Sequence, residues 1–306
     1  MNATTDTNKT HIQARRHLFR SLQPYLLLLP AILFMLVIII YPVMRTVQYS
    51  FTDYKLWKAN DIKWLGLGNY RSLLEDTDFL LASVNTLKWV LIILVFQFLI
   101  GLGVALLLNK SFRLRSVARG IVLIPWITPS IMTSLMWMWM YHGSFGVINH
   151  ILRELNLIKE FIPFLSQTTT ALYSCIFTAI WQGVPYFALM LMAGLSGIPD
   201  DLYEAGAVDG TSSWQAFWHI TLPGLKNIIF ITTLLRTIWI ANNVDLIYLM
   251  TGGGPANSTM TMSVLSFVTA QKGFDFGYAS SMSVVLSICL AIVAILYVRR
   301  MDIGEG

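Results

Sequence analysis

The chain has 306 residues, of which 56% are hydrophobic and only 12% are charged, and its formal net charge is +5 at pH 7. Soluble globular domains carry about 25% charged residues, so this composition excludes a soluble domain and indicates a membrane protein. The positive charge requires no nucleic-acid partner, because the basic residues flank apolar segments on one side of the predicted membrane.

Six long apolar segments follow one another along the chain. A bilayer core about 30 Å thick requires about 20 apolar residues per helix. The sequence therefore predicts an all-α membrane protein with six transmembrane helices, near residues 21–44, 89–108, 120–141, 170–195, 227–250 and 276–298. The first segment exceeds the core of a secretion signal, about 7 to 15 residues, and no small-x-small cleavage site follows it. We expect it to remain as a helix.

The positions of Lys and Arg predict the orientation. These residues concentrate before the first helix, between the second and third helices, and after the sixth helix. With six helices, all three segments lie on one side, which the positive-inside rule assigns to the cytoplasm. We expect a cytoplasmic segment at 1–20, a transmembrane domain at 21–300 and a cytoplasmic tail at 301–306. Cysteine and histidine show no metal-ligand spacing, so we expect no metal site.

The longest cytoplasmic loop, "PDDLYEAGAVDGTSSWQAFWHITLP" at 199–223, carries four carboxylates and no Lys or Arg. Its residues predict two short helices: Gly210 supplies a left-handed stop, and Ser212 with Gln215 forms a capping box. We expect the second helix to end at Pro223. The pair has more apolar surface than it can bury on itself, so it lies against the membrane or binds a protein. Its acidic character on the cytoplasmic face favours a protein partner.

This loop resembles the coupling loop of membrane subunits of ABC importers, with the pattern E-A-A, three residues, G, nine residues, I, one residue, L-P. The matching residues are Glu204, Ala205, Gly206, Gly210, Ile220, Leu222 and Pro223. Gly206 replaces the usual second alanine. Other stretches similar to carbohydrate-type permeases are "NTL" at 85–87, "LIPWITPSIMTSLMWMWMYHGSFGVIN" at 123–149, "SGIPDDLYEAGAVDG" from 196 and "IYLMTGGGP" at 247–255. The last resembles the first of the two permeases of such systems.

The resemblance implies a type I ABC importer permease fold, with both termini in the cytoplasm, in a multi-pass protein of the bacterial inner membrane. It implies a second homologous permease in a heterodimer, two cytoplasmic ATPase subunits, an extracytoplasmic binding protein and a carbohydrate substrate. The sequence has no G-x-x-x-x-G-K-[S/T] phosphate loop. We therefore expect a non-catalytic subunit without a cofactor, with ATP and Mg²⁺ on the partner ATPase. A permease for amino acids, peptides, polyols or ions is the alternative.

The resemblance also implies the role of the loop, which we call the coupling loop (residues 199–223). In the family it docks into a groove on the ATPase. The residues expected to make this contact are Glu204, Ala205, Gly206, Asp209 and Gly210. We expect Glu204 to supply a polar contact and Gly210 to set the angle between the two helices.

The two helices that flank the coupling loop are expected to hold the substrate. Positions that match sugar-contacting residues of maltose-type permeases are Gln182, Gly183, Tyr186, Arg236, Trp239, Ile240 and Asn243. An aromatic face can stack on a sugar ring, and amides can exchange hydrogen bonds with hydroxyl groups. A structural hydrogen bond between helices is the alternative role for Asn243.

Arg236 is an ionisable residue within a predicted membrane helix. Many relatives carry Asp three residues later, where this chain has Trp239. A buried, unpaired guanidinium is costly, so Asp245, the partner permease or the substrate must neutralise it. The third possibility predicts an anionic cargo, such as a uronate or a sulfonated or phosphorylated sugar derivative. A neutral saccharide or polyol is the alternative.

Overall fold

The computed structural model describes residues 27–302, with side chains described through residue 300. The predicted segment 1–20, the first residues of the first helix and most of the tail lie outside this range. The described part is helical apart from loops and two isolated β-bridges, which confirms the all-α prediction. Four continuous helices are long and apolar enough to span a bilayer, and two bent helix pairs bring the number to six.

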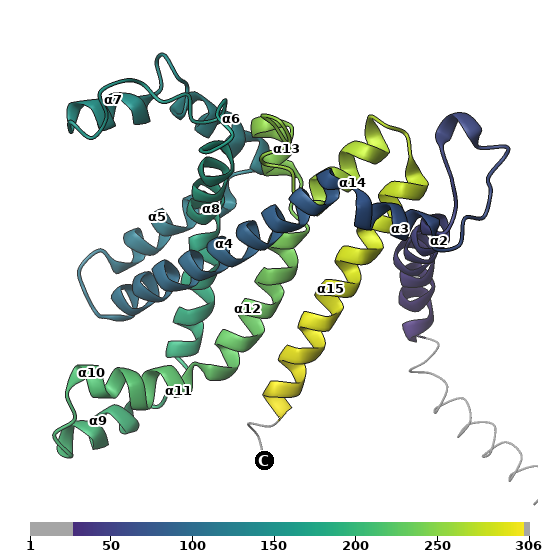
Figure 1. Cartoon of the computed structure of the whole chain (residues 1–306). Helices are drawn as coiled ribbons and strands as arrows, with labels where there is room; N and C mark the ends of the chain where they lie inside the picture. Colours follow the sequence, from purple (N-terminus) through teal and green to yellow (C-terminus); the bar gives the residue numbers. More distant parts are fainter. Residues whose placement is uncertain (1–26, 303–306) are drawn as a thin grey trace, which may run out of the picture.

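The four continuous spans form most of the bundle in Figure 1. They are Leu27–Ser50, whose second half is α2 (Tyr41–Ser50), α4 (Thr77–Asn109), α8 (Ala171–Leu195) and α15 (Phe276–Asp302). α4 and α8 pack closely, because Gly101 lets the backbones approach: a Cβ there would lie 2.5 Å from the Cβ of Phe187. The first span packs against α15 and leaves its apolar side chains exposed.

The apolar segment predicts a helix that starts near residue 89, but α4 begins earlier, at Thr77. The carboxylate of Asp76 caps the helix by accepting hydrogen bonds from the backbone N–H groups of Asp78 and Phe79. A capped helix end is fixed by this local bond and not by the start of the apolar run.

The predicted continuous helix 120–141 is instead two helices, α5 (Arg115–Ile127) and α6 (Ser130–Met140), whose axes differ by 92°. Pro129 disfavours helical geometry in the residue before it, and Thr128 accordingly has extended backbone with ψ 124°. α7 (Val147–Glu154) follows in the next loop. The break leaves the α5 end facing α8.

The predicted helix 227–250 is also interrupted. α12 (Lys226–Ala241) ends at Asn242, and α13 (Asp245–Thr251) begins three residues later. Asn243 fills the interruption, where its side-chain oxygen accepts from the backbone N–H of Leu246 at 3.4 Å. Asn side chains compete with the helix for backbone groups, which explains a break at this position.

The coupling loop forms the two predicted helices, seen as the hairpin at the lower left of Figure 1. α9 (Asp200–Val208) ends at Gly210, with φ +77°, and the N–H of Thr211 donates to the carbonyl of Gly206 at 2.8 Å. This is a Schellman stop. The capping box of Ser212 and Gln215 is present at the start of α10 (Ser213–Ala216).

The second helix of the coupling loop ends at Gly224, one residue after Pro223, in agreement with the predicted end. From α10 it continues through a π-helical turn (Phe217–Thr221) and α11 (Leu222–Gly224). Pro223 follows the π-helical turn and is the next-to-last residue of this helix. The chain then bends by 63° into α12. The coupling loop is therefore joined to α12 by a short bend and not by a flexible linker.

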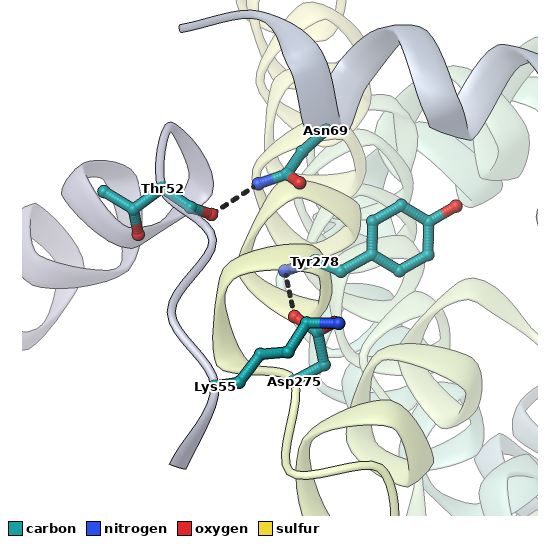
Figure 2. Close-up of polar contacts among 5 residues, drawn as sticks. All are labelled: Thr52, Lys55, Asn69, Asp275 and Tyr278. Carbon is teal, nitrogen blue, oxygen red and sulfur yellow. Dashed lines mark hydrogen bonds and ion pairs between the residues drawn. The ribbon is translucent and has the colours of Figure 1, made fainter. Parts of the chain in front are cut away.

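On the side opposite the coupling loop, polar contacts join the ends of four helices (Figure 2). Lys55 Nζ lies 3.0 Å from the carboxylate of Asp275, which also caps α15 by accepting from the N–H of Tyr278. Asn69, from α3 (Gly68–Glu75), donates to the carbonyl of Thr52 at 2.8 Å. The Tyr278 hydroxyl in turn donates to Asp76 at the start of α4. These bonds hold α2, α3, α4 and α15 together.

The "NTL" stretch at 85–87 contacts the turn that follows the "TGGGP" stretch. Asn85, in α4, donates to the carbonyl groups of Ser258 and Met260 at 3.1 and 3.0 Å, and the Thr86 hydroxyl accepts from the N–H of Met262 at 2.9 Å. These contacts fix the turn that follows the "TGGGP" segment and leads into α14 (Met262–Gln271).

Candidate functional site

A cavity of about 80 Å³ lies where α4, α8 and α12 meet. Larger hollows in the described chain are lined almost wholly by apolar side chains, whereas this one collects polar and aromatic groups. Its lining residues are Trp89, Ile93, Ala179, Gln182, Arg236, Trp239, Ile240, Asn243 and Leu246. The structure thus gathers five of the seven predicted substrate residues around one cavity.

The cavity lies deep within the membrane span. Arg236 is ten residues beyond Lys226, the first residue of α12, which corresponds to about 15 Å along the helix axis. A hydrocarbon core about 30 Å thick has its midplane at about this depth. The polar groups therefore lie where an unpartnered charge has a high cost.

Arg236 is held by an uncharged residue. Its Nε donates to the side-chain oxygen of Gln97 at 2.8 Å, and the amide nitrogen of Gln97 donates to the carbonyl of Ala179 at 2.7 Å. Gln97 is fully buried in α4, so its side chain is fixed by two helices. The guanidinium carbon of Arg236 also lies 5.6 Å from the ring centre of Tyr186, a cation–π contact.

No carboxylate among the described residues forms an ion pair with Arg236. Asp245, one of the three partners considered from the sequence, is exposed at the start of α13 and forms no such pair. The terminal nitrogens of Arg236 form no hydrogen bond with the described part of the chain, in which only Nε has a partner. Within the described chain, the positive charge of Arg236 therefore has no compensating carboxylate.

Gly183 and Tyr186 lie beside the cavity and support it. A Cβ on Gly183 would collide with the side chains of both Gln97 and Arg236, so glycine provides the clearance in which they meet. The Tyr186 ring packs 5.3 Å from the Trp239 ring, and its buried hydroxyl has no hydrogen-bond partner within the described residues. An unpaired buried hydroxyl is free to bind a ligand group or water.

The end of α12 is fixed from α4. The indole Nε1 of Trp89 donates to the carbonyl of Ile240 at 3.0 Å, at the turn where α12 stops. The Asn242 side chain donates to the carbonyl of Ile238 and is exposed, whereas Asn243 lines the cavity and its side-chain oxygen accepts from the N–H of Leu246. Ile240 is 4% exposed and contributes mainly packing.

Four residues of this region are not among the sequence predictions: Trp89, Gln97, Trp126 and Thr128. Trp126 lies at the end of α5, with its ring 6.2 Å from that of Tyr186, and the carbonyl of Thr128 is 3.5 Å from the amide nitrogen of Gln182. Only the helix break brings these two residues to α8. The sequence could have identified Gln97 as a candidate, because it is a lone amide in the apolar segment 89–108.

The coupling loop differs from the cavity in that most of its predicted contact residues are exposed. Glu204, Ala205, Asp209 and Gly210 are exposed on or directly after α9, and Glu204 forms no ion pair with a described residue. The two helices are pinned together by a hydrogen bond of 2.9 Å between the Tyr203 hydroxyl and that of Thr221. Four of the five predicted contact residues therefore lie on an exposed surface.

Gly206 faces inward between the two loop helices. A Cβ there would lie 3.2 Å from Cδ1 of Ile220, so the departure from alanine allows close packing against another residue of the motif. Apolar side chains remain exposed around the pair: Val208 is 87% exposed and Trp214 is 69% exposed. The hairpin alone does not bury its apolar surface.

Within the described part of the chain, no group of three or more His, Cys, Asp or Glu residues is placed to hold a metal ion.

Residues 97–303 match the family model described as "binding-protein-dependent transport system inner membrane component". The chain is 36% identical over 280 residues to the sulfoquinovosyl glycerol transport system permease protein SmoG of Agrobacterium fabrum, covering 90% of each chain. It is 34% identical over 275 residues to the trehalose/maltose transport system permease protein MalF of Thermococcus litoralis, covering 90% of this chain and 92% of the relative.

Among solved structures, the chain resembles one from the crystal structure of a bacterial ABC transporter involved in the import of the acidic polysaccharide alginate. The TM-score is 0.82 at 22% sequence identity, with 94% of this chain and 98% of the other covered. The likeness confirms the predicted importer permease fold.

Proposed function

This chain belongs to the family of inner membrane components of binding-protein-dependent transport systems, and on that premise we propose that it carries an anionic sugar derivative. It is a multi-pass permease subunit of a sugar ABC importer in the inner membrane. The cargo crosses beside the cavity between α4, α8 and α12. The coupling loop transmits the conformational change of an ATPase to the membrane helices.

The observation that carries the proposal is the uncompensated charge of Arg236. The guanidinium is held through Nε by a neutral amide, lines the cavity and has no carboxylate partner in the described chain. A carboxylate, sulfonate or phosphate on the cargo supplies the missing negative charge, and Arg binds such groups with two parallel hydrogen bonds. SmoG, one of the relatives, is named for a sulfonated glycoside, which supports this class.

The remaining predicted residues recognise the sugar itself. The Trp239 ring is half exposed beside the cavity and suits stacking on a sugar ring. Gln182 and Asn243 present amides that exchange hydrogen bonds with hydroxyl groups. Tyr186 adds a hydroxyl that lacks a partner. Gly183 acts indirectly, because it makes room for Arg236.

Partner subunits complete the transporter. A second homologous permease forms the other wall of the path in a heterodimer, and an extracytoplasmic binding protein delivers the cargo. Two ATPase subunits bind ATP and Mg²⁺ and receive Glu204, Ala205, Gly206, Asp209 and Gly210 of the coupling loops. This chain is the non-catalytic part: because the coupling loop joins α12 through a bend, closure of the ATPases moves the helix that carries Arg236.

The test replaces Arg236 by Gln in the complete transporter in proteoliposomes. Cargo candidates come from the cognate binding protein, as the sugars that raise its melting temperature in a panel of sulfonated, uronic and neutral compounds. We expect Arg236→Gln to lower uptake of an anionic cargo at least about tenfold, equal to about 1.4 kcal/mol, and to leave a neutral cargo nearly unchanged.

The matched control is Arg71→Gln, which removes an exposed arginine of α3 on the opposite side from the coupling loop. It should transport both classes normally. An equal loss of anionic and neutral uptake in Arg236→Gln would contradict the proposal of an anionic cargo and favour a structural role for the guanidinium.

A further inference from the structure

Gln97 occupies an unusual position for an amide. It is fully buried in the middle of α4, in a segment whose other residues are almost all apolar. Both ends of its amide are used: Oε1 accepts from Arg236 Nε at 2.8 Å, and Nε2 donates to the Ala179 carbonyl at 2.7 Å. The orientation of the amide is thereby fixed, because the Ala179 carbonyl can only accept.

The geometry points to Gln97 as the residue that sets the charge preference of the cavity. It holds Arg236 through one hydrogen bond to Nε, and unlike a carboxylate it adds no negative charge. This inference rests on the proposed function and deepens it: Arg236 binds the anionic group, and Gln97 is a positioning residue that keeps Arg236 available to that group.

Among the described residues, only Gln97 accepts a hydrogen bond from Arg236, and it does so from Nε. The ring of Tyr186 contacts the guanidinium at 5.6 Å but accepts no hydrogen bond from it. Gly183 leaves the space in which the Arg236 and Gln97 side chains meet. A carboxylate at the Gln97 position would form a buried ion pair and remove the attraction for an anionic cargo.

Gln97→Glu tests the inference by changing charge with almost no change in shape. The probes are glucuronate and glucose, which differ by a carboxylate in place of a CH₂OH group. Their dissociation constants are measured on the solubilised, assembled transporter without the binding protein, so that only the permease site selects. We expect the wild type to prefer glucuronate and Gln97→Glu to lose about tenfold or more of that preference.

A second variant, Gln97→Met, separates charge from position. Methionine keeps the length of the side chain and removes both hydrogen bonds, so Arg236 stays charged but is no longer held. We expect a preference between those of the wild type and Gln97→Glu. The glutamate of Gln97→Glu cannot donate to the Ala179 carbonyl, and this loss can prevent assembly. In that case Gln97→Met alone tests the inference.

The control is Gln271→Glu, which makes the same charge change at an exposed residue at the end of α14. It should bind both probes as the wild type does. If the wild type itself shows no preference for glucuronate, the proposed anionic cargo is wrong. If the wild type prefers glucuronate and both Gln97 variants keep that preference, only the assignment of Gln97 is overturned, and its role is packing.

Discussion

The coupling loop and the cavity obtain their properties in opposite ways. The loop is a local structure: α9, its glycine stop and the capping box are built from residues within 25 positions, and its contact residues are exposed. The cavity joins residues from four helices, and the Gln97–Arg236 contact spans 139 positions. Surfaces for partners can thus be encoded locally, whereas a charge deep in the membrane requires distant residues to meet.

The largest effect is expected from Gly210→Pro in the coupling loop. Gly210 has φ +77° and its N–H donates to the carbonyl of Ala207 at 3.1 Å, whereas proline requires φ near −65° and has no N–H. We expect the complex to assemble but uptake to fall by about a hundredfold or more, while ATP hydrolysis continues without transport. Uptake and ATPase activity are measured in the same proteoliposomes.

The matched proline control is Ser213→Pro, at the first helical position of α10, where proline is tolerated. It should couple normally. Normal transport by Gly210→Pro would show that the turn is not required for transmission.

Gly183→Ala should have the next largest effect and tests the opposite region. The added Cβ would displace Arg236 or Gln97, so cargo affinity should fall by about tenfold or more. Gly103→Ala, also in a membrane helix, adds a Cβ that meets nothing within 4 Å and should leave uptake unchanged. The KM for cargo is the measurement, and similar KM values in the two variants would contradict the role assigned to Gly183.

Tyr186→Phe should have a smaller effect and sharpens the description of the cavity. The hydroxyl has no partner within the described chain, so its removal should not lower the melting temperature of the complex. If the hydroxyl binds cargo, the KM should rise about threefold to tenfold, typical of one lost hydrogen bond. Tyr173→Phe, at an exposed position of the same helix, is the control. An unchanged KM would assign Tyr186 to packing alone.

Gly206→Ala should have the smallest effect. It restores the family pattern and favours the helix by up to about 1 kcal/mol, while the new Cβ lies 3.2 Å from a flexible end of Ile220. The two effects oppose each other, so we expect coupled ATPase activity within about twofold of the wild type. A loss comparable with that of Gly210→Pro would mean that the approach of the two helices, and not only their turn, transmits motion.

Local chemistry accounts for the parts that the sequence predicts correctly. Apolar length fixes the six spans, and Gly210, Ser212 and Gln215 fix the coupling loop, because each acts on backbone groups a few residues away. Pro223 likewise marks the end of the second loop helix to within one residue. The apolar pattern does not show the cap by Asp76, which starts α4 before the apolar segment begins.

By itself, the sequence determined the order of the apolar segments, the coupling loop and the presence of a charge at Arg236. Only the tertiary structure decided what that charge meets. The helix breaks at Thr128 and Asn243, the clearance at Gly183 and the amide of Gln97 come from separate elements that share no local pattern. The physical reason is that burial makes a charge depend on every group within a few ångströms, and those groups are chosen by packing and not by their order in the chain.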